Sequence, residues 1–169
     1  MDIFPKIVLE WQTFYLLVGT ASATLIGLLF VAVSIHIDVF HRKTSVYLHR
    51  FAALTFNCFF YVLLISILFL IPRISSLGLG ILLFLLGGLG LMNTIIQQRR
   101  VQIDQPKQQK NSLAARFNIP ILGLIGLVLI ALGMALQVDA SLYGLVIVII
   151  ILLGSASQNA WTLLVQIEG

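Results

Sequence analysis

The longest apolar run in the chain, residues 13–40, sets the first limit on what this sequence can fold into. A helix of this length would extend about 40 Å, which exceeds the roughly 30 Å hydrocarbon thickness of a bilayer. Trp11 and Tyr15 stand near one end of the run, where aromatic rings favour the headgroup level, and Arg42 and Lys43 follow the other end. The run therefore predicts a helix that spans a membrane.

Four further apolar runs are separated by short polar segments and predict four more spans. The predicted spans cover about residues 51–71, 77–96, 118–136 and 142–165. Backbone in contact with lipid must satisfy its hydrogen bonds internally, and the alternation typical of a membrane barrel is not visible. The sequence is 60% hydrophobic and 9% charged, which leaves too few charges to cover a surface in water. We therefore expect an all-α membrane protein in one domain, residues 1–169, with a long first helix followed by two helical hairpins.

The positions of Lys and Arg predict the orientation of these spans. The expected loop 41–50 holds three of the ten Lys and Arg residues, and the expected linker 97–117 holds five. Because loops rich in Lys and Arg stay in the cytoplasm, the N-terminus should lie outside and the C-terminus inside. Both segments should attract anionic lipid headgroups. Their place beside the membrane argues against nucleic-acid binding.

Small and polar side chains recur along the first span at steps of three and four residues, which puts them on one face of a helix. This set, called the stripe below, comprises Thr20, Thr24, Gly27, Val31, Ser34 and Asp38. Gly19, Ala23 and Gly27 add the spacing of small residues that lets helices pack closely in lipid. The stripe should meet protein or water rather than lipid. The alternative role for Asp38 is an ion pair with Arg42, four residues further along the chain.

A second set of polar residues lies toward the predicted cytoplasmic ends of the spans. Its members are His36, Asn57, Asn93, Gln158 and Asn159. Polar groups are costly in hydrocarbon unless they find partners or water, so this pooling predicts a polar pocket open to the cytoplasm. The alternative is a set of hydrogen bonds between helices that only holds the bundle together.

Glycines at heptad spacing predict two further surfaces of close packing between helices. Gly80 and Gly87 fall seven residues apart in the third span, with Thr94 after them, and Gly126 and Gly133 do so in the fourth.

Residues with catalytic or metal-binding chemistry are sparse. Cys58 is the single cysteine, so neither a disulfide within the chain nor a site of several cysteines can form. His36 and Asp38 are two residues apart and face different sides of a helix, and His41 and His49 lie in a basic segment that disfavours a metal ion. We expect no enzyme, no metal and no cofactor.

Residues 21–34 read Ala-Ser-Ala, three variable residues, then Gly-Leu-x-Phe-Val-Ala-x-Ser. This segment resembles the first helix of a family of small uncharacterised bacterial membrane proteins with the pattern A-S-A-x-x-x-G-L-x-F-V-A-x-S. The resemblance implies a multi-pass protein of the bacterial inner membrane and carries no activity with it.

These observations predict a homo-oligomer that forms a small ion channel or pore, lined by the stripe and weakly selective for cations. A non-conducting accessory or scaffold subunit, which would use the same stripe to bind a helix, is the first alternative. The second is a protein that binds a lipid or small molecule in the inner polar pocket.

Overall fold

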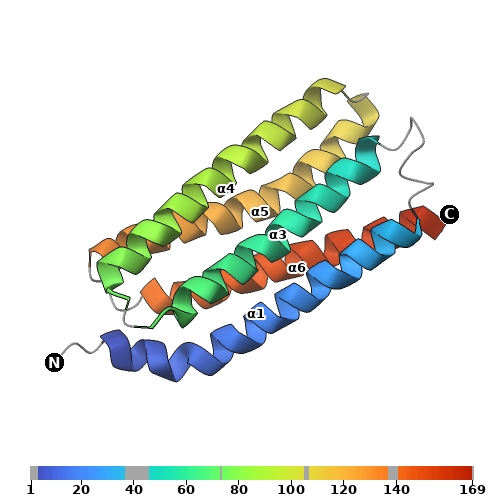
Figure 1. Ribbon diagram of the computed structural model, residues 1–169. Helices are drawn as coiled ribbons and strands as arrows, with labels where there is room; N and C mark the ends of the chain where they lie inside the picture. The colour runs from blue at the N-terminus through green and yellow to red at the C-terminus, as the bar shows by residue number, and fades with distance from the viewer. Residues whose placement is uncertain (1–3, 37–45, 73, 105–106, 137–140, 169) are drawn as a thin grey trace.

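The computed structural model describes residues 4–36, 46–72, 74–104, 107–136 and 141–168, and these form five α-helices. The helices are α1 (Phe4–Ile35), α3 (Val46–Leu70), α4 (Ser76–Asp104), α5 (Lys107–Ala135) and α6 (Ser141–Glu168). All five are long and apolar enough to span a membrane. The predicted all-α fold with five membrane helices is confirmed. The two termini lie at opposite ends of the bundle (Figure 1), whereas the side of the membrane that each faces stays a prediction.

The first helix begins and ends earlier than residues 13–40. It starts at Phe4 and carries Pro5 in its first turn, where a proline is tolerated because the missing N–H would have no partner in the helix. The helix ends at Ile35, and Asp38 lies outside the described residues. At 1.5 Å per residue α1 is about 48 Å long, so it must tilt or extend beyond the hydrocarbon.

The stretch 97–117, expected as a polar linker, is largely helical. α4 continues to Asp104 and α5 begins at Lys107. Gln, Lys and Arg are good helix formers, so the helix persists after the apolar residues end. Residues 105 and 106, which lie between the two helices in the sequence, are outside the described residues.

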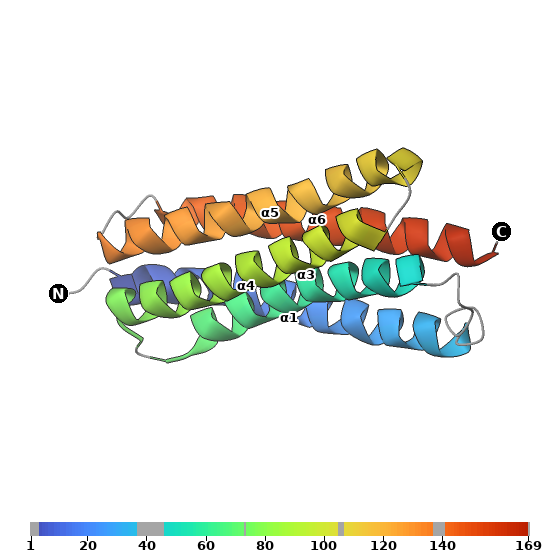
Figure 2. The ribbon, with the colours of Figure 1, turned by 90° about the horizontal axis from the view of Figure 1, so that it is seen from above.

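The helices pack in two layers, which Figure 2 shows from above. α5 and α6 form one layer, and α4, α3 and the later part of α1 form the other. α3 packs against α1 and α6 and also touches α4, which makes it the most buried of the five spans. α1 packs mainly on α3 and touches α6 only briefly, so it lies at the edge of the bundle.

Glycines let α4, α5 and α6 approach closely, as their heptad spacing predicted. A Cβ atom added at Gly87 would stand 2.8 Å from Val128 Cγ2, and one at Gly80 would stand 3.2 Å from the carbonyl oxygen of Ala131. A Cβ at Gly126 would stand 3.0 Å from Val148 Cγ2 on α6. These three glycines therefore lie where helices pack closely, as predicted.

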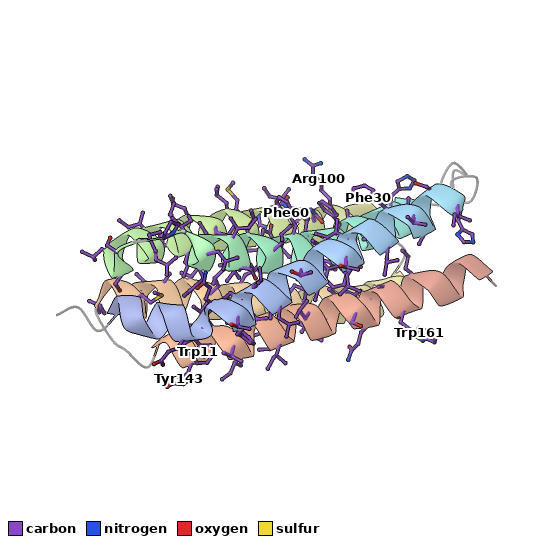
Figure 3. All side chains as sticks on the ribbon, turned by 60° about the horizontal axis from the view of Figure 1, so that its bottom comes forward. Trp11, Phe30, Phe60, Arg100, Tyr143 and Trp161 are labelled. Atoms are coloured by element: carbon purple, nitrogen blue, oxygen red, sulfur yellow. The ribbon has the colours of Figure 1, made fainter. Side chains whose placement is uncertain are left out.

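Aromatic side chains mark the two ends of the apolar zone. The rings of Trp11 on α1 and Tyr143 on α6 meet edge to face with their centroids 5.6 Å apart, and Figure 3 shows both at one end of the bundle. Trp161 lies toward the other end of α6 and is exposed. Tyr143 and Trp161 are about 27 Å apart along the helix, close to the thickness of a hydrocarbon core. This spacing is what two aromatic belts at the membrane interfaces require.

Candidate functional site

One face of α1 is fixed against α3. Tyr15 is buried and its ring stacks on that of Phe69, with centroids 4.1 Å apart. One turn later a Cβ at Gly19 would stand only 2.9 Å from the Cβ of Ser66, so the two backbones come close together there. Ser22 follows on the same side and is fully buried. This face is α1's contact with the rest of its own chain.

The stripe lies on the opposite side of α1. Thr20, Thr24, Gly27, Val31 and Ser34 are all exposed in the single chain, and Val31 keeps 55% of its surface accessible. At 3.6 residues per turn these positions cluster around a direction roughly opposite to that of the face on α3. Among the described residues, nothing outside the adjoining backbone of α1 stands within 4 Å of a Cβ placed at Gly27. The stripe's described residues are therefore open on the side of α1 that faces away from α3.

The small residues Gly19, Ala23 and Gly27 do not form one contact surface within the chain, although their spacing had suggested a single surface. Gly19 packs on α3, whereas Ala23 and Gly27 are exposed. A step of four residues turns about 40° around a helix, so eight residues turn about 80°. That rotation carries Gly27 from the buried side to the open side.

The threonine hydroxyls of the stripe are bonded to their own helix. Thr20 Oγ1 donates to the carbonyl oxygen of Leu16 at 2.8 Å, and Thr24 Oγ1 donates to that of Thr20 at 2.9 Å. These bonds remove the cost of an unpaired hydroxyl in hydrocarbon. Each hydroxyl oxygen can still accept a hydrogen bond or contact a cation.

The open faces of α4 and α5 differ in chemistry from that of α1. Their exposed residues are mostly large and aliphatic, as expected for helices in contact with lipid tails. On α5 these residues are Ile119, Leu122, Ile125, Leu129, Leu132 and Leu136. The open side of α1 also exposes large apolar side chains between Leu16 and Ile35, but it interleaves them with small and hydroxyl residues, at Thr20, Ala23, Thr24, Gly27 and Ser34. Such composition is typical of a surface where helices meet.

The five residues of the predicted inner polar pocket differ in their exposure within the single chain. Asn159 is buried and its Nδ2 atom has no hydrogen-bond partner, whereas the neighbouring Gln158 is exposed. Asn93 is also exposed, and its side-chain oxygen accepts a bond from Gln97 Nε2 at 3.3 Å. His36 and Asn57 are half-buried.

His36 also bonds within its own helix. Its Nδ1 atom lies 3.0 Å from the carbonyl oxygen of Ala32. The five residues thus range from the buried Asn159 to the exposed Asn93 and Gln158, and the inner polar pocket stays a prediction.

A hydrophobic groove between α1 and α3 was not foreseen from the sequence. It has a volume of about 250 Å³ and is lined by Leu29, Phe30, Val33, Ala52, Ala53 and Phe56. Phe30 and Phe56 meet edge to face with centroids 5.6 Å apart. The available signal was the pair of alanines at 52 and 53, whose short side chains leave space beside the larger residues of α1.

Metal-binding chemistry is sparse within the described ranges, where no three His, Cys, Asp or Glu side chains come together. Cys58 on α3 is a free thiol, buried in a cluster with Leu54, Phe59, Phe117, Ala156 and Leu163.

Comparison of the chain with protein-family models, with characterised proteins and with solved structures finds no match. The resemblance of residues 21–34 to bacterial first helices therefore stays a prediction. The chain is an integral membrane protein by its five apolar helices, and its function must be argued from the surfaces described above.

Proposed function

We propose that this protein assembles into a homo-oligomer through the open face of α1, with the stripe lining a small pore that weakly prefers cations. One observation carries the proposal: among the exposed residues of α1, α4 and α5 whose burial the structure describes, small and hydroxyl side chains recur along the helix only on α1, at Thr20, Thr24, Gly27 and Ser34 of the stripe. Helices in lipid associate through close packing and hydrogen bonds, which small and hydroxyl residues provide. Large aliphatic residues would serve a lipid contact better.

The order of residues along the stripe supports conduction. Thr20, Thr24 and Ser34 offer hydroxyl oxygens as weak ion ligands, and Val31 supplies a hydrophobic constriction of the kind that gates by dewetting. In an oligomer, Asp38 would repeat around the axis as an acidic ring at the cytoplasmic mouth and would raise the local cation concentration. These roles need several copies of α1 around one axis.

A non-conducting scaffold is the second candidate, and the hydrogen bonds of Thr20 and Thr24 favour it. Both hydroxyls already donate to carbonyl oxygens of α1, so they need no water. The stripe would then be a dry contact between helices, with Asp38 paired to Arg42 in its own chain. In either case the protein resides in a bacterial inner membrane, with anionic lipids near its basic cytoplasmic segments.

Assembly is tested by adding a large side chain at Gly27. Gly27→Leu should reduce the oligomer fraction in mild detergent because leucine would hold neighbouring helices apart. Gly88→Leu on α4 is the matched control, since at both glycines an added Cβ has no neighbour within 4 Å among the described residues beyond the adjoining backbone of its own helix. If light scattering gives the wild-type mass for both variants, α1 does not form the interface between copies.

Conduction is tested with purified protein in planar bilayers. Val31→Ser should raise the conductance by wetting the constriction, and Asp38→Asn should reduce the preference for cations. Leu129→Ser, on the lipid-like face of α5, should change neither. If the wild type and Val31→Ser assemble but carry no current under steps of voltage, tension or pH, the scaffold is the function.

A further inference from the structure

A proline interrupts the main-chain hydrogen bonding of α5. Pro120 lies inside this helix, and its nitrogen carries no hydrogen. In an α-helix that hydrogen would be donated to the carbonyl oxygen four residues earlier, which belongs to Arg116. The main chain of α5 therefore has an acceptor at Arg116 whose usual donor is missing. In a membrane such an acceptor is tolerated where a neighbouring helix or water can supply a donor.

α6 carries a buried donor without a partner. Asn159 is 3% exposed, and its Nδ2 atom makes no hydrogen bond. Ala156 and Leu163 stand three residues before it and four residues after it, on the same face of the helix. Both belong to a buried cluster that also contains Phe117 of α5. Asn159 therefore lies on the face of α6 that packs toward the turn of α5 before Pro120.

The register of α5 on α6 puts this donor and this acceptor at one level of the bundle. A Cβ added at Gly123 of α5 would stand 3.0 Å from Leu152 Cδ2 of α6, which fixes the register of the two helices. Arg116 precedes Gly123 by seven residues, and Asn159 follows Leu152 by seven. Seven residues cover about 10.5 Å and nearly two full turns, so both positions stay on the faces that meet at Gly123.

The two helices diverge toward this end of the bundle, as Figures 1 and 2 show from two directions. Proline is a frequent cause of helix bending, because it removes one hydrogen bond and its ring crowds the carbonyl group four residues earlier. α5 is therefore easiest to bend at Pro120. A bend toward α6 carries the carbonyl group of Arg116 toward Asn159.

We propose that α5 and α6 form a latch with two states. This structure is the unlatched state; in the latched state α5 bends at Pro120, and Asn159 Nδ2 donates to the carbonyl oxygen of Arg116. An unpaired buried donor and a bent helix both cost free energy, so the two states are close in stability. The end of α4 moves with α5, because Gln98 Nε2 of α4 donates to Asn118 Oδ1 of α5 at 3.3 Å. The latch uses no residue of the stripe, so it does not depend on the protein being a pore or an oligomer.

Distances between two spin labels test the latch. They are measured by pulsed electron paramagnetic resonance on the full chain in lipid nanodiscs. The labels are attached to cysteines that replace Arg100 on α4 and Ser157 on α6, which are both exposed, in a chain where Cys58 is replaced by alanine. The chain with Pro120 and Asn159 intact should give two distances. The shorter one belongs to the latched state, since bending carries the end of α4 toward α6.

Three variants separate the latch from other motions. Asn159→Leu removes the donor and should abolish the shorter distance; it also removes the unpaired nitrogen of the unlatched state, so the fold is retained. Pro120→Ala supplies the missing N–H to the carbonyl oxygen of Arg116 and should abolish the shorter distance as well. Asn93→Leu makes the same exchange as the first variant at an exposed position of α4 and should keep both distances.

The double variant, with Asn159→Leu and Pro120→Ala together, should match either single variant, because each change removes the same state. A single distance in the chain with Pro120 and Asn159 intact, unchanged by Asn159→Leu, would overturn the latch. Two distances that persist in Asn159→Leu would also overturn it, because another contact would then hold the second state. Two distances that persist in Pro120→Ala would do the same, and this variant decides the question if Asn159→Leu fails to fold.

Discussion

The contact between Gly19 on α1 and Ser66 on α3 gives the sharpest test of how α1 is held. A Cβ at position 19 would stand 2.9 Å from the Cβ of Ser66, and this neighbouring atom is attached directly to the backbone. Carbon atoms prefer a separation of about 3.5–4.0 Å, so Gly19→Ala must push the two helices apart by roughly 0.6–1 Å at this point. The stacked rings of Tyr15 and Phe69, one turn away, would loosen with them.

The expected loss of stability follows from a comparison with Gly27→Ala on the same helix. Overpacking a tight contact costs about 1–3 kcal/mol. Replacing glycine by alanine in a helix also gains up to about 1 kcal/mol, and this gain applies equally at both positions. A Cβ at position 27 has no neighbour within 4 Å among the described residues, apart from the adjoining backbone of α1. Gly19→Ala should therefore be less stable than Gly27→Ala by about 1–3 kcal/mol.

Cys58 supplies the assay. It is the single cysteine and is 1% exposed, so a thiol-reactive dye labels it only when the bundle opens. Labelling against temperature in mild detergent should give Gly19→Ala a midpoint roughly 2–12 °C below that of Gly27→Ala, at about 2–4 °C per kcal/mol for a chain of this size. Equal midpoints would refute the close approach of α1 to α3.

Three further predictions follow from the charge pattern and from buried groups. A cysteine at Ser76 should react with an impermeant thiol reagent added outside intact cells, and one at Ser112 should not; labelling at position 112 would reverse the orientation. Gly87→Ala should unfold at a lower temperature than Gly88→Ala by the equivalent of about 1–3 kcal/mol, since an added Cβ has a neighbour at 2.8 Å at position 87 and none within 4 Å at position 88. Asn159→Leu should keep or raise the melting temperature by the equivalent of about 1 kcal/mol, because it removes a buried amide nitrogen that has no partner; a large loss would show that this amide has a bound partner.

Hydropathy was sufficient to predict the number of spans, because about twenty apolar residues in sequence have few other uses in a protein. The predicted second span ends at Ile71, directly before Pro72, and the observed helix α3 ends one residue earlier, at Leu70. It did not locate the start of α1 or the end of α4, since apolar residues mark the hydrocarbon zone and not the limits of the helix. Gln98 shows the difference: it lies past the predicted third span, yet it is helical and its Nε2 atom donates to Asn118 Oδ1 on α5 at 3.3 Å.

The rotation of each helix about its axis was much harder to predict. Gly80, Gly87 and Gly126 were recognised as packing positions because glycine has few other reasons to recur at heptad spacing in a membrane helix. The inner polar residues gave no such signal. Gln158 and Asn159 are adjacent in sequence and were assigned to one pocket, but about 100° of rotation leaves one exposed and the other buried.

The spacing of the stripe predicted residues on one face of a helix, and its five described members are all exposed. The sequence could not show which molecule this face contacts. A face of small and hydroxyl residues fits a contact within the chain as well as a contact between chains. The structure argues against the first choice for Thr20, Thr24, Gly27, Val31 and Ser34, because α3 occupies the other side of α1 and these five positions are exposed. What distinguishes a pore from a scaffold is then the state of the hydroxyls. In a dry interface the bonds from Thr20 and Thr24 to their own backbone suffice, whereas in a pore the same oxygens also accept from water. The conductance of Val31→Ser measures that difference directly, since wetting of the stripe is the one property that the two functions do not share.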